Sequence, residues 1–186
     1  MSIFVSTFLF EAMGVKESLQ FDRRLVDEGH YALLLTGHLV HLNWAHWGLN
    51  MAGLGLVALF FSAHGRAWHW LGVLLISALF SSLGVYWFNP ETITVVGLSA
   101  VLHGLFLYGA ALETEQDRAS GCVLLALLGA KLTWERFGGA MPGSESIVGG
   151  HVLTDAHLYG AIGGACAVAI FSRQTLVALL PARLRR

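Results

Sequence analysis

The chain has 186 residues, of which 55% are hydrophobic and 12% are charged. That charged share is about half of what an ordinary soluble domain carries. Together with a mean hydropathy of +0.64, it indicates an integral membrane protein. A net charge of -1 gives no support to nucleic-acid binding, which needs a basic surface to neutralise phosphates. Cys122 and Cys166 lie in different apolar segments without a CxxC pattern, which favours buried thiols over a disulfide or redox pair.

The first apolar segment, residues 1–14, would extend only ~20 Å as a helix, against a hydrocarbon core of ~30 Å. We therefore expect a short first span or one whose beginning is missing. A signal peptide fits less well, because no basic residue precedes the apolar run. Residues 15–43 are rich in charge and are expected to form a loop outside the hydrocarbon.

Five more apolar segments predict membrane-crossing helices, with approximate bounds 44–63, 67–88, 96–112, 121–135 and 155–172. Asn89-Pro90 ends the third span, because proline disfavours helix in the residue before it. A basic tail, 173–186, follows the sixth. The sequence thus predicts an all-α polytopic bundle of six transmembrane helices, forming a single domain over residues 1–186.

The basic tail, Arg66 and Arg118 favour a cytoplasmic position for both termini, by the excess of Lys and Arg on that side. Spans two, four and six then enter the membrane from the outer face. Each carries polar residues in its first turns: His46 and Asn50, Ser99 and His103, and His157. Ionisable groups inside a bilayer are costly and usually mark function. Their common depth predicts one site near the outer surface.

Ser99 has the surroundings that a nucleophile needs, because Gly97 and Ala100 leave the backbone beside it uncrowded. His103 lies one helical turn further along the same face. On the sixth span, His157, Gly160 and Gly164 share a face. A neighbouring helix can therefore approach closely enough for a Ser-His hydrogen bond of ~3 Å. The alternative is that Ser99 is only a small-residue packing contact.

Other polar residues allow simpler explanations. His38 and His41, with Trp44 and Trp47, form either an interfacial belt or part of the site. Asp155 points about 200° away from His157 around the helix and is interpreted as an N-cap rather than a catalytic acid.

A catalytic metal is not expected, although six histidines lie on the outer side: His38, His41, His46, His103, His151 and His157. No HExxH motif occurs, and no acidic residue stands at ligand spacing beside them. No cofactor is expected either.

The chain resembles the rhomboid intramembrane serine proteases in three motifs. HxxxxHxxxN is met by His41, His46 and Asn50, GxS by Gly97 and Ser99, and HxxGxxxG by His157, Gly160 and Gly164. Within rhomboids it is most similar to the rhombosortase branch, judged by FDRRLV, LTGHLVHLNWAHWGLN, GLSAVLHG, and Lys131 with Trp134-Glu135. Ala100 and His103, which replace a glycine and a tyrosine of most rhomboids, suit this branch. The usual Trp-Arg pair of the first outer loop is replaced by Ala32-Leu33.

The resemblance implies an endopeptidase with a Ser-His dyad. Ser99 is the expected nucleophile and His157 the general base and acid, oriented by His103 and the glycine face because no carboxylate is expected to do so. His46, Asn50 and the backbone N–H of Ser99 are the expected oxyanion hole. Supporting residues are His41, Gly97, His103, Gly160 and Gly164.

The implied substrates are exported bacterial proteins ending in a Gly-Gly motif, a transmembrane helix and a basic tail. Glycine weakens a helical substrate and so exposes the scissile bond. The implied location is the bacterial inner membrane, with the site facing the periplasm. Water or an amine could release the acyl group. The alternative is a proteolytically inactive rhomboid-like protein that binds and escorts transmembrane clients. A transporter is disfavoured, since no inverted repeat is visible.

Overall fold

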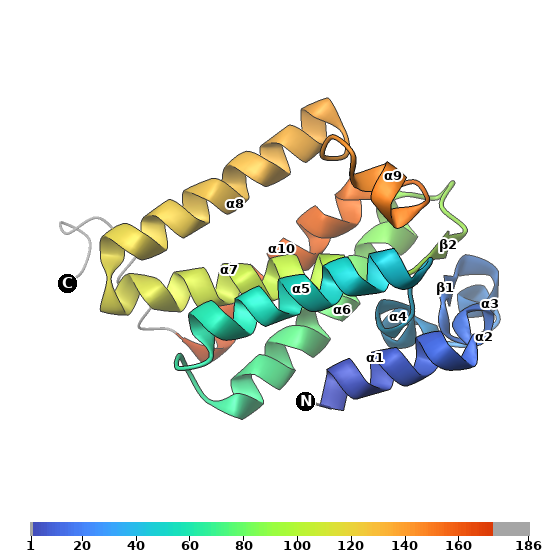
Figure 1. Ribbon diagram of the computed structural model, residues 1–186, viewed down its shortest axis with the longest axis horizontal. Helices are drawn as coiled ribbons and strands as arrows, with labels where there is room; N and C mark the ends of the chain where they lie inside the picture. The colour runs from blue at the N-terminus through green and yellow to red at the C-terminus, as the bar shows by residue number, and fades with distance from the viewer. Residues whose placement is uncertain (1, 173–186) are drawn as a thin grey trace.

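The computed structural model describes residues 2–172, so the predicted basic tail lies outside the described part. The fold is mostly helical, as predicted. Its long helices are α1 (Ser2–Met13), α5 (Trp44–Phe61), α6 (Ala67–Phe88), α7 (Ser99–Gln116), α8 (Arg118–Gly138) and α10 (Thr154–Phe171). Figure 1 shows the segments that precede α5, α7 and α10 gathered at one end of the bundle, with the α5–α6 and α7–α8 links at the other.

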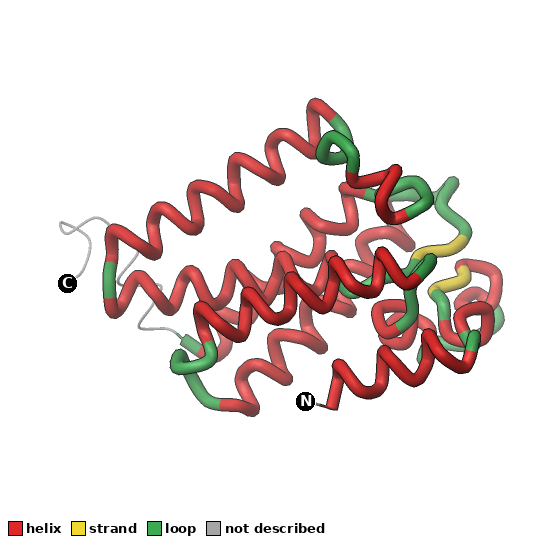
Figure 2. The backbone as a smooth tube through the Cα atoms, viewed as in Figure 1, coloured by secondary structure: helices red, strands yellow, loops and turns green. Residues whose placement is uncertain are grey.

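The segment between α1 and α5 is more structured than the loop that the sequence predicts. It contains α2 (Lys16–Leu19), β1 (Phe21–Asp22), α3 (Arg23–Asp27), α4 (Leu33–Thr36) and the 3-10 helix η1 (Gly37–Leu39). β1 pairs in antiparallel fashion with β2 (Thr94–Val95), at the end of the bundle seen at the right of Figure 2. This pairing ties the first loop to the segment that leads into α7.

Arg23 anchors this loop to the end of α6. Its guanidinium donates to the carbonyl oxygens of Val85, Tyr86, Asn89 and Thr92, at 2.7 to 3.0 Å. The last carbonyls of a helix have no partner within it, so these bonds complete the α6 terminus. Arginine suits the position because its donors form a rigid fork.

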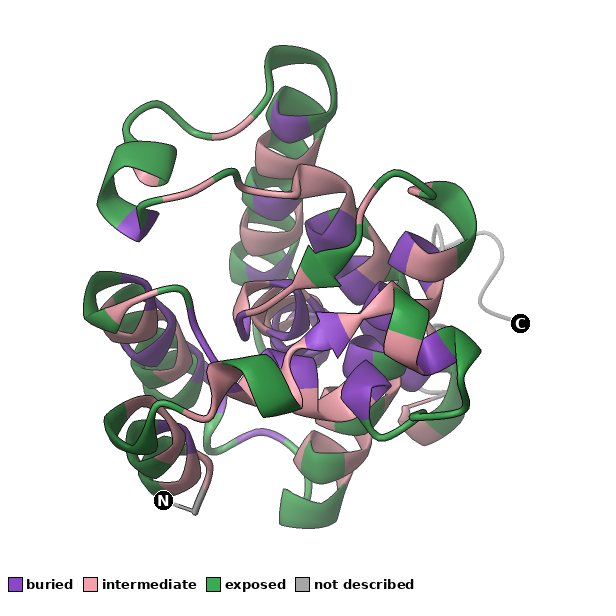
Figure 3. Ribbon diagram, turned by 90° about the vertical axis from the view of Figure 1, so that its right-hand side faces the viewer, coloured by how far each residue is buried: buried purple, intermediate pink, exposed green. Residues whose placement is uncertain are grey.

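Two of the described helices, α5 and α6, are long and apolar enough to cross a membrane by length and composition, and Ile3–Met13 is a shorter apolar helix. The six-span arrangement therefore stays a prediction. In Figure 3, viewed along the bundle, buried residues gather where the helices meet and exposed residues lie on their outer sides.

α10 packs against both α6 and α7 through glycines. A Cβ atom added at Gly160 would lie 2.0 Å from the carbonyl oxygen of Ala100, and one at Gly164 would lie 2.3 Å from that of Gly104. No real Cβ atom approaches a neighbour so closely. The absence of side chains thus lets the backbones of α7 and α10 touch, which brings the first turns of both helices together.

Two helices begin at other residues than the approximate spans that the sequence predicts. The fourth span was expected from residue 96, but α7 begins at Ser99, because Gly97 has a φ of +113° that a helix does not accommodate. α8 is longer than the predicted 121–135, since the Asp117 side chain accepts from the N–H groups of Ala119 and Ser120 and starts the helix earlier.

Candidate functional site

Ser99 and His157 lie face to face at the ends of α7 and α10. The Ser99 Oγ atom is 2.9 Å from His157 Nε2, and the His157 ring is buried while Ser99 is partly exposed. Ser99 is the first residue of α7, where helix N–H groups have no carbonyl partner within the helix and the dipole favours negative charge. A hydroxyl, an acceptor for its proton and a positively polarised helix end therefore meet at one point.

A carboxylate stands behind His157, contrary to the expectation that none would orient the imidazole. Glu135 of α8 is buried, and its Oε2 atom lies 3.0 Å from His157 Nδ1. Its other oxygen, Oε1, accepts from Lys131 Nζ at 2.5 Å. Asp155, the acid considered from sequence, instead accepts from Asn89 and Arg136. It is also not an N-cap, because Leu153 holds that position and makes no side-chain cap bond.

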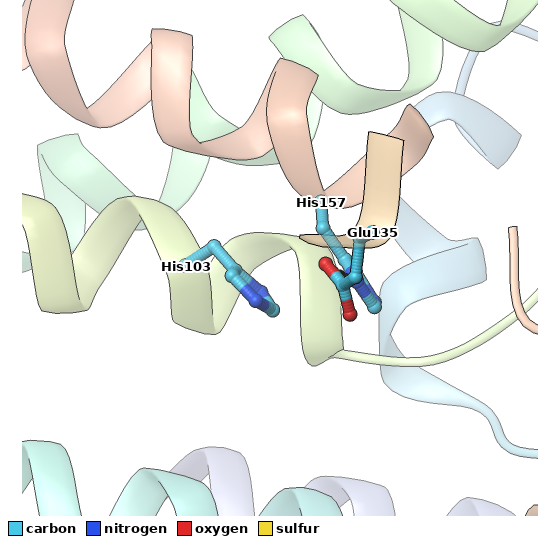
Figure 4. A group of neighbouring side chains, drawn as sticks. All are labelled: His103, Glu135 and His157. Atoms are coloured by element: carbon cyan, nitrogen blue, oxygen red, sulfur yellow. Dashed lines mark hydrogen bonds and ion pairs between the residues drawn. The ribbon is translucent and has the colours of Figure 1, made fainter. Parts of the chain in front are cut away.

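His103 stacks on His157, with ring centroids 4.3 Å apart and planes within 15°. Its Nε2 atom lies 2.8 Å from Lys131 Nζ, and its Nδ1 atom lies 2.7 Å from the carbonyl oxygen of Ser99. Figure 4 shows the side chains of His103, Glu135 and His157 converging from α7, α8 and α10. We call Ser99, His157, Glu135, Lys131 and His103 the α7–α8–α10 cluster.

Two donors on α5 face the segment before Ser99. The N–H of Leu42 donates to His46 Nδ1 at 3.3 Å, so the neutral ring carries its proton on Nε2. Asn50 Nδ2 is buried without a hydrogen-bond partner among the described residues. A Cβ at Gly97 would lie 2.7 Å from His46 Nε2 and 3.4 Å from Asn50 Nδ2. Only glycine leaves room for both donors here.

A cavity of about 470 Å³ opens onto these groups. It is lined by the side chains of Ser99, His157, His46 and Asn50, and by Met141 and Val148 from the segment around α9 (Ser144–Val148). α9 is tethered to the start of α5, because Asn43 Nδ2 donates to the carbonyl oxygen of Val148 at 2.8 Å. Ser99 therefore faces a cavity that the segment around α9 partly covers, rather than the packed core.

His38 and His41 are buried, so the interfacial-belt explanation was wrong for both. The His38 ring lies 3.2 Å from the carbonyl oxygen of Gly97 and 3.0 Å from Ser82 Oγ, joining the segment before Ser99 to α6. The His41 ring packs edge-on against His46, with centroids 5.1 Å apart. Burial lowers the pKa of His38, and burial together with His46 lowers the pKa of His41 to about 3. Both imidazole rings are therefore neutral, and each holds the neighbouring residues that it contacts in place.

His103, Glu135 and His157 lie close enough together to be tested as metal ligands, with their ligand atoms within 4.8 Å of one another. Lys131 already places an ammonium group against two of the three. A second cation would have to displace it. The donor set therefore fits an internal ion pair better than a metal.

Sequence reasoning missed the position of Glu135. It considered only the helices that enter from the outer face, whereas α8 runs the other way and reaches the same end with its last turns. A usable signal was present, because Lys131 and Glu135 are four residues apart and thus on one face of an otherwise apolar segment.

Comparison with known proteins gives one match. A family model described as Rhomboid domain matches residues 28–174, which include α5 to α10 and the whole α7–α8–α10 cluster. No curated protein and no solved structure matches the chain. The rhomboid family generally comprises intramembrane serine proteases. Since the matched range covers well over half of the 186 residues, the chain belongs to the rhomboid family.

Proposed function

We propose that the protein is an intramembrane serine endopeptidase in which Ser99 is the nucleophile and His157 the general base and acid. The observation that carries this proposal is the 2.9 Å distance between Ser99 Oγ and His157 Nε2 at the wall of a cavity. Nucleophilic catalysis by serine requires a base within hydrogen-bond reach of the hydroxyl. The pair also has space beside it for a peptide.

In the proposed reaction, Ser99 Oγ attacks the scissile carbonyl carbon while its proton passes to His157 Nε2. The C–N bond then breaks as His157 returns that proton to the departing amine, leaving an acyl-enzyme. Water then attacks the ester carbon while His157 takes its proton, the bond between that carbon and Ser99 Oγ breaks, and His157 returns the proton to Oγ as the carboxylic acid product leaves. An amine acceptor would react at the same carbon, which would make the reaction a transfer.

The oxyanion of the tetrahedral intermediate would lie among the donors beside Gly97. His46 Nε2–H and Asn50 Nδ2 face this segment from α5, and the Ser99 N–H completes the set from α7. Within the described part of the chain Asn50 Nδ2 has no partner, which supports this role, because a buried donor without a partner is costly unless a ligand uses it. Preorganised donors of this kind are typically the largest single contribution to catalysis.

The substrate class we propose follows the rhombosortase resemblance. Exported proteins that end in a Gly-Gly motif, a transmembrane helix and a basic tail would present flexible backbone at the outer end of a span. Glycine there exposes the carbonyl that a helix otherwise hides. We place the protein in a bacterial inner membrane with six spans and with the cavity toward the periplasm. The grouping of the segments before α5, α7 and α10 at one end supports a common side for them, and the distribution of Lys and Arg favours the periplasm as that side.

The test uses Ser99→Ala and His157→Ala, each co-expressed with a reporter that carries a Gly-Gly, helix and basic-tail C-terminus. Ser120→Ala, an exposed serine of α8, is the matched control. We expect trimming of the reporter by the wild type and the control, and none by the two variants. Trimming by Ser99→Ala at the wild-type rate would contradict the proposal.

A fluorophosphonate that labels activated serines separates a protease from an escort without knowledge of the substrate. Labelling of the wild type at Ser99 supports a protease. A protein that binds transmembrane segments but leaves Ser99 unlabelled fits the escort function instead.

A further inference from the structure

We infer that Glu135 is a positioning residue that holds His157 in the tautomer needed for catalysis, and that Lys131 and His103 keep Glu135 and His157 in place. Ser99 and the buried pair His157 and Glu135 would then form a Ser-His-Glu triad supported by a lysine, in place of the expected dyad. This inference rests on the proposed function, which it deepens. It depends on three contacts of the α7–α8–α10 cluster.

The first contact fixes the proton on His157. Glu135 Oε2 lies 3.0 Å from Nδ1, and an ionised carboxylate can only accept. Nδ1 therefore carries the hydrogen, which leaves Nε2 with a free lone pair facing Ser99 Oγ at 2.9 Å. Without a partner for Nδ1, the imidazole could equally carry its proton on Nε2, where it could not accept a proton from serine.

The second contact keeps Glu135 ionised. Its side chain is only 3% exposed, and a buried carboxylate without a counter-charge tends to take up a proton. Lys131 Nζ lies against Oε1 and supplies the opposite charge. The two residues are four positions apart on α8, so the helix itself holds them together.

The third contact fixes the proton on His103. A lysine ammonium has donors but no acceptor, so His103 Nε2 accepts from Lys131 and Nδ1 carries the hydrogen. Nδ1 then donates to the carbonyl oxygen of Ser99 at 2.7 Å. The same ring stacks on His157 at 4.3 Å. His103 thereby holds the nucleophile's backbone with its edge and the base with its face.

These contacts assign the charge at each step. When Ser99 attacks, the proton moves from Oγ to Nε2 and His157 becomes a cation between Glu135 and the oxyanion. Glu135 keeps its negative charge and takes no proton. Its role is to orient the ring and stabilise the imidazolium, which is how the carboxylate of other serine-hydrolase triads acts.

A first experiment needs no activity. Nitrogen-15 NMR of histidine-labelled protein in detergent reports which ring nitrogen carries hydrogen, and the loss of signals in His157→Asn assigns the ring. We expect His157 to carry hydrogen on Nδ1 and not on Nε2, in the wild type and also in Ser99→Ala. Hydrogen on Nε2, or the same spectrum in Glu135→Gln as in the wild type, would overturn the inference.

A second experiment measures fluorophosphonate labelling and the kcat and KM for the reporter in Glu135→Gln and Glu135→Asp. Glu91→Gln, the same change at an exposed position, is the matched control. We expect Glu135→Gln to lower kcat by about 10²- to 10⁴-fold with little change in KM, since Glu135 acts through the base. Glu135→Asp should recover part of the loss, because it keeps the charge. Equal rates for the Asp and Gln variants would instead indicate packing and refute the role.

A third experiment compares Lys131→Met in the wild-type and Glu135→Gln backgrounds. If Lys131 acts through Glu135, Lys131→Met lowers the labelling rate in the wild-type background and adds little in the Glu135→Gln background. Full additivity would contradict the proposed link. These outcomes differ from failure of the proposed function, which would appear as an unlabelled wild type while the NMR result still decides the tautomer.

Discussion

Substituting Gly160 by alanine tests whether the close contact of α7 and α10 sets the distance between nucleophile and base. The added Cβ would lie 2.0 Å from the Ala100 carbonyl oxygen, whereas real Cβ atoms keep at least 3.0 Å. The helices must therefore separate locally by about 1 Å. Ser99 and His157 are the near neighbours of this contact on each helix. A shift of that size along the line between them would lengthen their 2.9 Å hydrogen bond beyond hydrogen-bond distance.

We expect Gly160→Ala to reduce fluorophosphonate labelling by about 10²-fold, the usual cost of a misplacement of this size. Overpacking should also lower the free energy of unfolding by about 1–3 kcal/mol. Thermal unfolding in detergent measures the second effect. Gly55→Ala in α5 is the control, since an added Cβ there meets nothing within 4 Å. It should leave labelling unchanged. If Gly160→Ala labels as fast as Gly55→Ala, the reasoning about helix approach is wrong.

Three further predictions concern the oxyanion donors, the first loop and pH. Asn50→Ala should lower reporter turnover by about 10²- to 10³-fold without lowering the melting temperature, because Asn50 Nδ2 has no hydrogen-bond partner to lose within residues 2–172. A wild-type kcat would exclude Asn50 from the oxyanion hole. Arg23→Ala should lower the free energy of unfolding by about 2–4 kcal/mol by uncapping α6, and Arg23→Lys should not restore it. A loss no larger than that of the exposed Arg24→Ala would argue against the cap. The pKa of His41 is lowered to about 3, so the unfolded chain protonates first as pH falls. The contribution of neutral His41 to the free energy of unfolding is complete above pH ~6.5. Below that pH it declines by up to about 1.4 kcal/mol per pH unit. His41→Leu should flatten melting temperature against pH over that range, and an unchanged slope would show that His41 does not contribute.

The sequence alone was sufficient to place site residues on a common face where all of them lie on one helix. His157 with Gly160 and Gly164, or His46 with Asn50, can be placed on one face by periodicity, and helix direction then brings the two faces to one end. Glu135 could not be placed in this way, because the pattern within α8 does not show that its side chain meets His157 of α10. The start of α7 was equally hidden, since it depends on the positive φ of Gly97 and on the pairing of β1 with β2.

Asn43 has a consequence for how a peptide reaches Ser99. Its Oδ1 atom accepts from the N–H of His46 and caps α5. Its Nδ2 atom donates to the carbonyl oxygen of Val148 and so holds α9 beside the cavity. The hydrogen bond to Val148 can break while the hydrogen bond that caps α5 stays intact, because the two use different atoms of one amide. A hydrogen bond of this kind contributes about 0.5–1.5 kcal/mol. A peptide that displaced Val148 from Asn43 would therefore leave the start of α5 capped, and His46 and Asn50 on that helix would keep their places beside Gly97.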